Sequence, residues 1–581
     1  MAYNSFQAHI CQCFSRLATA KKHSVVTIAG SRRKTGQQFV GSVLTLATGL
    51  LQLGLRNGDV VAISALNSDW YLEWLLAVAY IGGIVAPLNY RWSFEEARSA
   101  MLTVSPVMLV TDESSDYWHS LLHSYAIPLL RWHVSLSSPS SDFMNKWNIL
   151  PMQILMEHSA GSPDSQPLNY SYAPEGAVVI CFTSGTTGRP KGVTIGHSAL
   201  IVQSLAKVAM VAYSEDDVYL HTAPLCHIGG LSSAMAMLMV GACHVLIPKF
   251  EAVSALEAIE QHHVTSLITV PAIMADIISS IRLKETWKGR DCVKKILNGG
   301  GGLSNELIKD ATKFFPRAKL LSAYGMTEAC SSLTFMTLYD PTFESPATLL
   351  PMFAKTKSNP VHQQEGVCVG KPAPHVELKI CSADSSHAGR ILTRGPHLML
   401  RYWDQIPENV SISSKEVWFD TGDIGFIDDS GNLWLIGRKN GRIKSGESFS
   451  RHPLPYVLLN CLKECLLLVE ALLLEHPGVI AAVVVGIPDA RLTEKIVACI
   501  RLRENWQWSN NNEHSAQGKE LSLSDEILRG YCRQKDLSRF KIPRIFVLWR
   551  IPFPLTTTGK IRRDRVRIEV MSKLQVLPSS L

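Results

Sequence analysis

The chain has 581 residues, of which 46% are hydrophobic and 18% are charged. This globular composition excludes a mainly disordered chain, and a length of about four average domains excludes a fold that depends on disulfides or metals. The net charge of +7 is small for this length and gives no reason to expect nucleic acid as a partner. Among the 13 cysteines there is no pair of C-x-x-C motifs, so we expect free thiols in a reducing compartment rather than a zinc site.

The two ends of the chain carry features of organelle targeting. Seven lysine and arginine residues precede the first acidic residue, Asp59, and such a start is typical of a transit peptide. The alternative is that this segment is simply the first structural element. The last three residues, Ser579, Ser580 and Leu581, approximate the peroxisomal S-K-L signal.

Short apolar runs bounded by turn residues alternate with longer helical patterns along most of the chain. We expect strands at residues 60–64, 84–88, 107–110, 177–182, 244–247 and 266–270, and helices at 70–80 and 252–262. Alternating strands and helices predict parallel sheets built from βαβ units. The most apolar stretch, residues 454–474, contains three charged residues, so we expect no integral membrane association.

Polar or Gly-rich segments predict loops and a boundary. Residues 137–141 and 159–174 are rich in Ser and Pro, and the Asn-rich residues 505–520 predict a disordered surface insertion. Residues 425–435 predict a hairpin with its turn at 429–432. A domain boundary is expected in the basic, Gly-rich stretch that follows, residues 437–446.

The strongest chemical signal is a loop that follows the strand at 177–182. It reads T-S-G-T-T-G-R-P-K-G and offers four hydroxyls, three glycines and two cations in ten residues. Glycines let backbone N–H groups converge on an anion, while hydroxyls and cations add further bonds and charge. The loop therefore predicts polyphosphate binding. It is not a Walker A loop, because Lys191 is followed by glycine.

This loop and four later segments, in the same order, resemble the motifs of the ANL superfamily of adenylate-forming enzymes. The later segments are S-A-Y-G-M-T-E-A at 322–329, W-F-D-T-G-D at 418–423, G-R-K-N with I-K-S-G at 437–446, and P-L-T-T-T-G-K-I at 554–561. Together the five motifs cover about residues 40 to 570. Each motif residue taken alone could be an ordinary turn, cap or surface residue, but the occurrence of all five motifs in order favours the resemblance.

The resemblance implies a fold and a domain organisation. We expect an α/β protein with a large N-terminal domain of stacked mixed or parallel sheets with helices, residues 1–439. A small mobile α+β domain, residues 440–581, would follow it. One segment departs from the family pattern: about residues 448–468 replace the G-E-N and P-x-E signatures and are about a dozen residues too long. We interpret it as a retained intron or a faulty gene model, with a real inserted helix as the alternative, and expect it to impair thioester formation most.

The resemblance also implies an activity and a set of site residues. An AMP-forming acid–CoA ligase uses ATP, Mg²⁺ and coenzyme A to make an acyl-adenylate and then an acyl-CoA thioester. Glu328 would bind Mg²⁺, Thr327 the α-phosphate, and Lys560 would bridge the attacking carboxylate and the nucleotide. The residues expected to hold ATP are Thr183, Ser184, Gly185, Thr186, Thr187, Gly188, Lys191, Gly300, Gly301, Tyr324, Asp423 and Arg438, with Tyr324 against adenine and Asp423 and Arg438 at the ribose.

His227 lies in the segment A-P-L-C-H-I-G-G-L, which resembles the family's lining of the acyl and thiol tunnel. We expect it to act in catalysis, with a buried core histidine as the alternative. Its neighbour Cys226 is expected to be buried and inert.

Three sequence runs resemble ligases for 2-succinylbenzoate, an acid of phylloquinone biosynthesis. They are A-P-L-C-H-I-G-G-L, L-N-G-G-G-G-L-S and S-A-Y-G-M-T-E-A-C-S-S-L-T-F. The resemblance implies a small aromatic carboxylic acid as substrate and a chloroplast or peroxisomal location. The alternatives are another acid, such as a hydroxycinnamate or a medium-chain acid, or a non-catalytic variant that only binds nucleotide.

Overall fold

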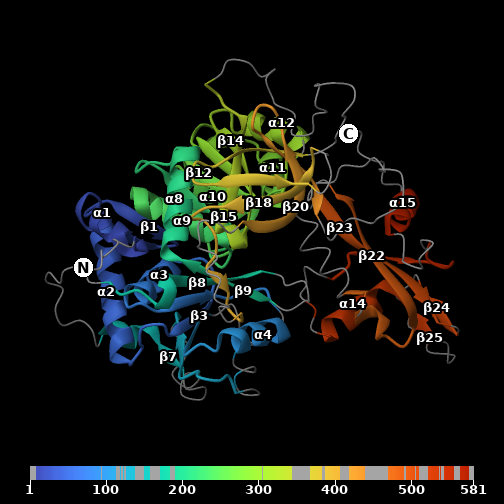
Figure 1. Ribbon diagram of the computed structural model, residues 1–581, viewed down its shortest axis with the longest axis horizontal. Helices are drawn as coiled ribbons and strands as arrows, with labels where there is room; N and C mark the ends of the chain where they lie inside the picture. Colours follow the sequence, from blue (N-terminus) through green and yellow to red (C-terminus); the bar gives the residue numbers. More distant parts are fainter. Residues whose placement is uncertain are drawn as a thin grey trace. The chain divides into compact units, whose positions relative to one another are not determined.

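The computed structural model describes residues 8–574 (Figure 1). The description leaves out residues 93, 113–117, 119–121, 123–125, 138–148, 158–169, 184–189, 304, 343–366, 383–386, 406–417, 439–468, 471, 490–492, 504, 510–520, 536, 538–541 and 555–562. The chain divides into two compact units. One contains Met1–Tyr90, Ala97–Thr183 and Lys191–Leu454, and the other contains Pro455–Leu581 with the short segments Arg91–Glu96 and Ser184–Pro190.

The first unit contains a mixed sheet of eight strands in its described residues. In spatial order the strands are β19 (Arg401–Tyr402), β9 (Lys191–Gly196), β8 (Ala177–Thr183), β4 (Ile84–Pro87), β3 (Val60–Ser64), β5 (Met108–Thr111), β6 (Trp132–Ser135) and β7 (Leu150–Pro151). From β8 to β7 the neighbours are parallel, and β9 turns back antiparallel to β8. Strand β3 is buried throughout, as its continuous apolar run predicts.

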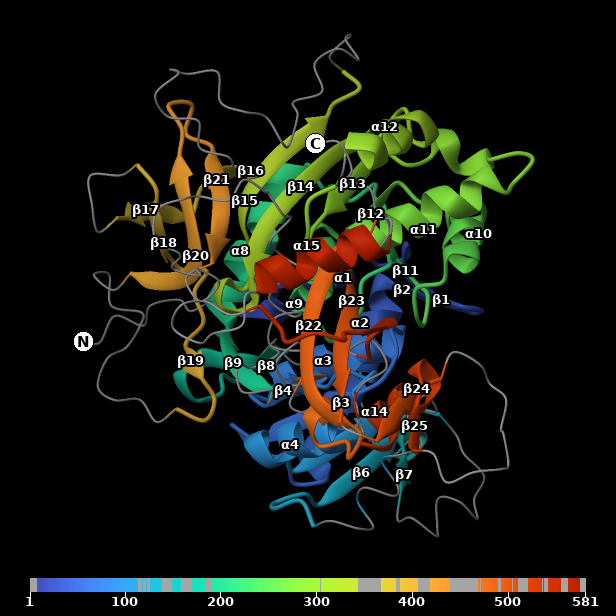
Figure 2. The same cartoon turned by 90° about the vertical axis from the view of Figure 1, so that its right-hand side faces the viewer.

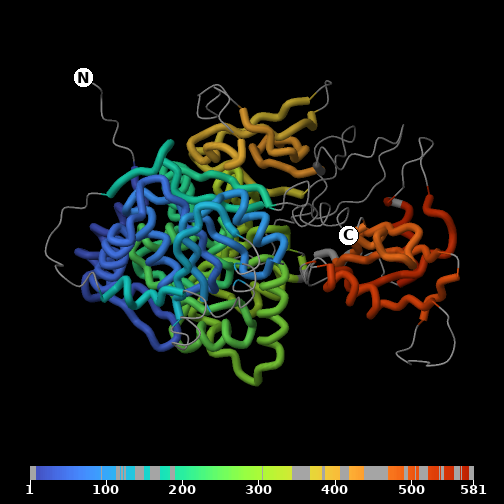
Figure 3. Tube along the Cα trace, turned by 90° about the horizontal axis from the view of Figure 1, so that it is seen from below, coloured from blue at the N-terminus to red at the C-terminus, as the bar shows by residue number. Residues whose placement is uncertain are grey.

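The second sheet of this unit has 13 strands in the described part. In spatial order they are β17 (Glu377–Cys381), β18 (Gly389–Arg394), β20 (Phe419–Ile427), β21 (Leu433–Arg438), β16 (Val367–Pro372), β15 (Ser331–Tyr339), β14 (Lys319–Met326), β13 (Lys295–Asn298), β12 (Ser266–Thr269), β10 (Val218–His221), β11 (Cys243–Leu246), β1 (Val25–Ala29) and β2 (Arg32–Thr35). The pairing of β1 with β11 brings the blue and green parts of the chain side by side (Figure 3).

Helices connect and cover these strands. They are α1 (Cys13–Thr19), α2 (Gly36–Gln52), α3 (Asp69–Tyr80), α4 (Phe94–Val104), α7 (Met152–Glu157), α8 (His197–Val211), α9 (Ile228–Val240), α10 (Ala252–His262), α11 (Pro271–Arg282) and α12 (Asn305–Phe314), with 3-10 turns η1 (Ile10–Gln12), η2 (Pro174–Gly176), η3 (Lys288–Asp291) and η4 (Thr327–Ala329). Helices α8 and α9 pack together, and α8 contacts β9 of one sheet and β15 of the other. Ten of the residues of α9 are buried, which agrees with a helix that is apolar all round.

The basic N-terminal segment is part of this core. Ile10, Phe14 and Leu17 are fully buried in the main hydrophobic cluster. Lys34 of β2 forms ion pairs with Asp69 and Glu73 of α3. Burial therefore supports the alternative interpretation of these residues as the first structural element.

The second unit is a small α+β domain, and Figure 2 shows its strands and helices. Its elements are β22 (Val479–Asp489), β23 (Thr493–Leu502), β24 (Trp506–Trp508), β25 (Leu521–Leu523), α14 (Asp525–Gln534), β26 (Ile545–Leu548) and α15 (Arg563–Lys573). Strand β23 pairs antiparallel with β22 and parallel with β26, and α15 packs on β22. Buried Glu470 accepts a hydrogen bond from the Val484 N–H and pairs with Arg563 of α15 at 2.5 Å.

Most expected elements are confirmed, and one expectation is wrong. The helix at residues 252–262 and the strand at 60–64 have the expected bounds, and β20 and β21 form the expected hairpin. Residues 506–508, however, lie in β24 rather than in a disordered insertion, because Trp506 and Trp508 pack against the hydrophobic cluster of the second unit. Residues 510–520 lie outside the described part.

Candidate active site

Four neighbouring strands of the 13-stranded sheet run parallel and end at one edge. They are β10, β12, β13 and β14. Their carboxyl ends are followed by residues 222–227, 270, 299–302 and 327–328. Ligands of open α/β sheets bind in the crevice outside such strand ends. The fold thus brings His227, Gly300, Gly301, Thr327 and Glu328 to the same edge of one sheet.

The glycine loop after β13 has a conformation that suits its composition. Gly300 has φ +66°, a left-handed conformation that glycine adopts without strain. The Asn298 side chain donates a 2.6 Å hydrogen bond to the carbonyl of Gly301 and fixes the loop. A Cβ at Gly299 would meet no described atom within 4 Å, so the backbone here borders open space in the described structure.

The turn that carries Thr327 and Glu328 is tightly constrained. Cys330 and Ser331 have φ values of 52° and 115°, and a Cβ at Gly325 would lie 1.6 Å from the carbonyl oxygen of Ser331. Buried Gln203 of α8 donates from Nε2 to the carbonyls of Ala329, at 2.9 Å, and Ser332, at 2.7 Å. Helix α8 therefore holds the two ends of this turn. The sequence reasoning missed Gln203, which carries no local signal.

Glu328 is linked through Tyr402 of β19 to the β8–β9 hairpin, which bears the loop expected to bind phosphate. Its Oε1 accepts a 2.9 Å hydrogen bond from Tyr402 Oη, and the Lys191 ammonium lies 5.6 Å from the centroid of the Tyr402 ring. Thr183 and Lys191 are cross-strand partners at the end of the β8–β9 hairpin. The hairpin therefore places the start and end of the loop near Glu328. Ser184, Gly185, Thr186, Thr187 and Gly188 lie outside the described residues.

Tyr324 and Asp423 form a buried pair. The phenol donates a 2.5 Å hydrogen bond to Asp423 Oδ2, which joins β14 to β20. Thr421 Oγ1 accepts from the Asp423 N–H at 3.1 Å, and Gly422 between them has φ +75°. Asp423 is also the cross-strand partner of Arg438. An aromatic ring next to a fixed acceptor suits a nucleoside, and the arrangement brings together three residues predicted for that role.

The arrangement near Glu328 also suits a magnesium ion. Within the described residues, no group of three or more His, Cys, Asp and Glu side chains could enclose a metal. A single carboxylate is nevertheless an ordinary protein ligand for Mg²⁺ that is shared with substrate phosphates. Glu328, half-buried and close to the Lys191 hairpin, fits that requirement.

His227 is the N-cap residue of α9, and its side chain is exposed. The alternative of a core histidine is therefore wrong. Cys226 is buried, as expected, and every cysteine in the described part of the chain is free. Lys560 and residues 448–468 lie outside the described residues, so their roles remain predictions.

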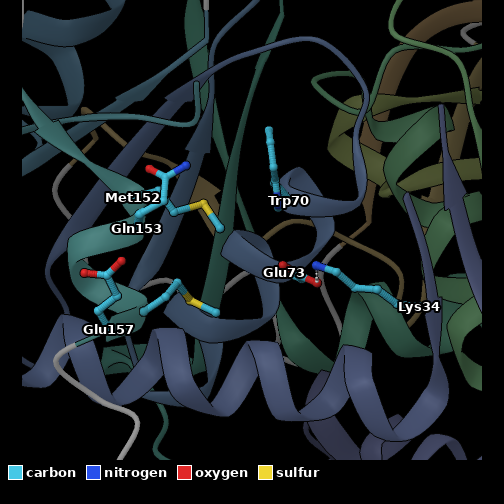
Figure 4. Close-up of a pocket in the computed structure, with 7 residues that line it drawn as sticks. Lys34, Trp70, Glu73, Met152, Gln153 and Glu157 are labelled. Atoms are coloured by element: carbon cyan, nitrogen blue, oxygen red, sulfur yellow. Dashed lines mark hydrogen bonds and ion pairs between the residues drawn. The ribbon is translucent and has the colours of Figure 1, made fainter. Parts of the chain in front are cut away.

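A cavity of about 280 Å³ in the first unit is lined by other residues (Figure 4). Its lining consists of Lys34, Trp70, Glu73, Met152, Gln153, Met156 and Glu157. Burial raises the pKa of Glu73 to about 7, although Lys34 pairs with it at 2.5 Å. Because no predicted site residue lines this cavity, it is not part of the candidate active site.

No helix in the described ranges is long and apolar enough to cross a bilayer.

Comparison with known proteins assigns the chain to a family. The model of AMP-binding enzymes matches residues 14–403, and that of their C-terminal domain matches residues 468–560. The chain belongs to the AMP-binding enzyme family. It is an AMP-forming acid–thiol ligase, which confirms the activity class that the five motifs predict.

The similarity to one curated relative extends over the whole chain. The chain is 55% identical to the 2-succinylbenzoate–CoA ligase, chloroplastic/peroxisomal, of Arabidopsis thaliana over 100% of both proteins.

Two solved structures show the same fold. An amide bond synthetase of Marinactinospora thermotolerans has a TM-score of 0.72 and 23% identity, covering 97% of this chain and 99% of that one. The o-succinylbenzoate CoA synthetase of Bacillus subtilis has a TM-score of 0.68 and 22% identity, covering 96% and 98%. The expected fold class is thereby confirmed.

Proposed function

We propose that this chain joins 2-succinylbenzoate to coenzyme A with ATP as the energy source, as a step of phylloquinone biosynthesis. The observation that carries the substrate assignment is the 55% identity to the Arabidopsis ligase over the full length of both chains. The geometry supports the chemistry, because Lys191, Glu328 and the Tyr324–Asp423 pair are positioned by strands that meet at the candidate site.

The first half-reaction forms an acyl-adenylate. A carboxylate oxygen attacks the α-phosphorus of ATP, the bond to the β-phosphate oxygen breaks, and pyrophosphate leaves. The protein has to bring two anions together and stabilise the charge that develops. Lys191 and the loop that begins at Thr183 would bind the β- and γ-phosphates, and Thr327 would bond the α-phosphate.

Nucleoside recognition would use the buried pair. The Tyr324 ring would lie against adenine with Gly300 and Gly301 on the backbone side, and Asp423 would accept hydrogen bonds from the ribose with help from Arg438. Mg²⁺, held by Glu328, would supply charge neutralisation for the phosphates. Lys560, in the second unit, would bridge the carboxylate and the nucleotide.

The second half-reaction forms the thioester. The sulfur of coenzyme A attacks the acyl carbon, the bond to the AMP oxygen breaks, and the thiol proton passes to a base or to solvent. Exposed His227, at the start of α9, is the residue we propose to act on the acyl or thiol group.

A chloroplast or peroxisomal location is part of this proposal. The Arabidopsis relative carries both locations in its name, and residues 579–581 approximate a peroxisomal signal. Cleavage of a transit peptide after residue 17 would remove Ile10, Phe14 and Leu17 from the core. We therefore expect the mature protein to retain these residues.

The decisive experiment measures both products on one purified sample. Acid-dependent pyrophosphate release and CoA-thioester formation are followed with 2-succinylbenzoate, a hydroxycinnamate and octanoate. We expect both products with 2-succinylbenzoate alone. Turnover of another acid instead would replace the substrate assignment. Pyrophosphate without thioester would locate the defect in the second half-reaction, and neither product in a folded protein that binds ATP would identify a non-catalytic variant.

A further inference from the structure

Lys207 is a completely buried lysine in the middle of α8. Its side-chain ammonium donates to the Ser232 hydroxyl at 2.6 Å, to the Ser233 hydroxyl at 3.0 Å and to the Gly229 carbonyl at 3.2 Å. All three acceptors are neutral. In the described part of the chain, no carboxylate forms an ion pair with Lys207.

A buried ammonium without a counter-anion is unfavourable, and lysine is almost never fully buried unless it is paired. Burial lowers the pKa of Lys207 to about 7. A methionine of similar length would fill the same space without that cost. The titratable group that faces Lys207 is the buried thiol of Cys330, and burial raises the pKa of that thiol to about 12, so it stays neutral. The position therefore has a charge for which the described protein supplies no carboxylate partner.

The surroundings of Lys207 lie at the candidate active site. All three acceptors belong to the first two turns of α9, which begins at the strand-end edge described above. Gln203, one turn earlier on the same face of α8, bonds the carbonyl of Ala329 next to Glu328. A Cβ at Gly229 would meet only Ile268 Cδ1, at 4.0 Å, so there is room beside this residue in the described structure.

We propose that Lys207 recognises the second carboxylate of the acid substrate, the one that is not adenylated. The inference rests on the proposed function, because 2-succinylbenzoate carries two carboxylates and a hydroxycinnamate or octanoate carries one. The bond to the Gly229 carbonyl is the longest of the three, and Gly229 has room beside it up to Ile268. A carboxylate bound there replaces a neutral acceptor with a charged one, which roughly doubles the strength of the hydrogen bond.

Binding should then be coupled to protonation. An anion beside the amine favours its charged form and raises its pKa. Above pH 7 the free protein holds Lys207 mostly neutral, so the dicarboxylate complex takes up a proton. An acid without the second carboxylate produces no such uptake.

The first test compares two substrates in two variants. The probe acids are 2-succinylbenzoate and 4-oxo-4-phenylbutanoate, which has the same skeleton without the ring carboxylate. In Lys207→Met we expect the preference for the dicarboxylate in kcat/KM to fall by about 10-fold or more, the loss of a charge-assisted bond. The KM for ATP should stay unchanged. Lys249→Met, at an exposed lysine, is the matched control and should retain the preference.

The second test uses the unaltered protein and so does not depend on how a variant folds. Calorimetric titration with 2-succinylbenzoate at pH 8, in two buffers of different ionisation enthalpy, should show net proton uptake. Titration with 4-oxo-4-phenylbutanoate should not.

Equal losses of kcat/KM for the two acids in Lys207→Met would overturn the inference and indicate a packing role. Identical proton uptake on binding of the two acids would also overturn it. Wild-type turnover of 2-succinylbenzoate separates this failure from failure of the proposed function. Without that turnover, both proposals fall.

Discussion

Tyr324 donates a 2.5 Å hydrogen bond to Asp423, although the two residues lie 99 positions apart in the sequence. The sequence motifs assign one residue to adenine and the other to ribose but do not indicate that they touch. In the fold, the phenol orients the carboxylate, so one hydrogen bond links the two parts of the proposed nucleoside site.

Tyr324→Phe should therefore weaken ATP binding even though the aromatic ring remains. A hydrogen bond to a charged group contributes about 1.5–3 kcal/mol, so we expect the KM for ATP to rise about 10-fold or more. Initial-rate kinetics at saturating acid and CoA would measure this. Tyr213→Phe is the control, because the hydroxyl of that buried tyrosine has no partner in the described structure. An unchanged KM for ATP in Tyr324→Phe would show that Asp423 is oriented without the phenol.

Glu328→Gln should raise the Mg²⁺ concentration needed for half-maximal pyrophosphate release by about 10-fold or more, because an amide is a weaker ligand for a hard cation than a carboxylate. Tyr402→Phe removes the 2.9 Å hydrogen bond but keeps the carboxylate, so we expect a smaller shift in the same direction. A titration of activity against Mg²⁺ distinguishes the two. A Glu328→Gln variant with the wild-type Mg²⁺ dependence would exclude Glu328 as the ligand.

Gln203→Leu should destabilise the turn that carries Thr327 and Glu328. The substitution leaves the carbonyls of Ala329 and Ser332 without their donor, at a cost of about 1–3 kcal/mol for each buried group. We expect a lower midpoint of urea unfolding and slower pyrophosphate release. Loss of stability with full adenylation activity at low temperature would show that the turn holds its shape without α8.

Acid should destabilise the first unit through its buried histidines. Burial holds the pKa of His244 at about 3 and that of its hydrogen-bonded neighbour His221 well below 6.5. Below pH 6.5 these histidines take up protons in the unfolded chain but not in the folded chain. Their contribution to the free energy of unfolding is therefore complete above pH 6.5 and falls toward pH 3. Urea unfolding at pH 7 and pH 5 should show a lower midpoint at pH 5. His244→Asn keeps an acceptor for His221 and should reduce that difference, whereas an equal difference in the variant would contradict this cause.

The segment at about residues 448–468 lies outside the described residues, and its effect remains a prediction. A variant that lacks the extra residues and restores the G-E-N signature should form thioester faster than this chain. Pyrophosphate release in the first half-reaction should change less. Single-turnover measurements of both products would separate the two steps, and equal thioester rates would show that the segment is harmless.

Local sequence patterns determined much of this protein. The buried strand at residues 60–64 follows from its continuous apolar run, because a strand covered on both faces has no polar side. The helix at 252–262 follows from apolar residues that recur with the period of a helix. The order of five motifs identified the enzyme class for a similar reason, since each motif is a continuous segment with its own chemistry.

Only the tertiary structure decided which distant residues meet. Gln203 contacts Ala329, Tyr402 contacts Glu328, and Lys207 contacts Ser232 and Ser233, and none of these pairs is marked by spacing or composition. Likewise, Trp506 and Trp508 lie in a polar stretch of sequence, and they form a strand because they pack against the hydrophobic cluster of the second unit. The contacts of Gln203, Glu328 and Lys207 depend on the packing of α8, α9 and the two sheets, which brings together residues that are far apart along the chain.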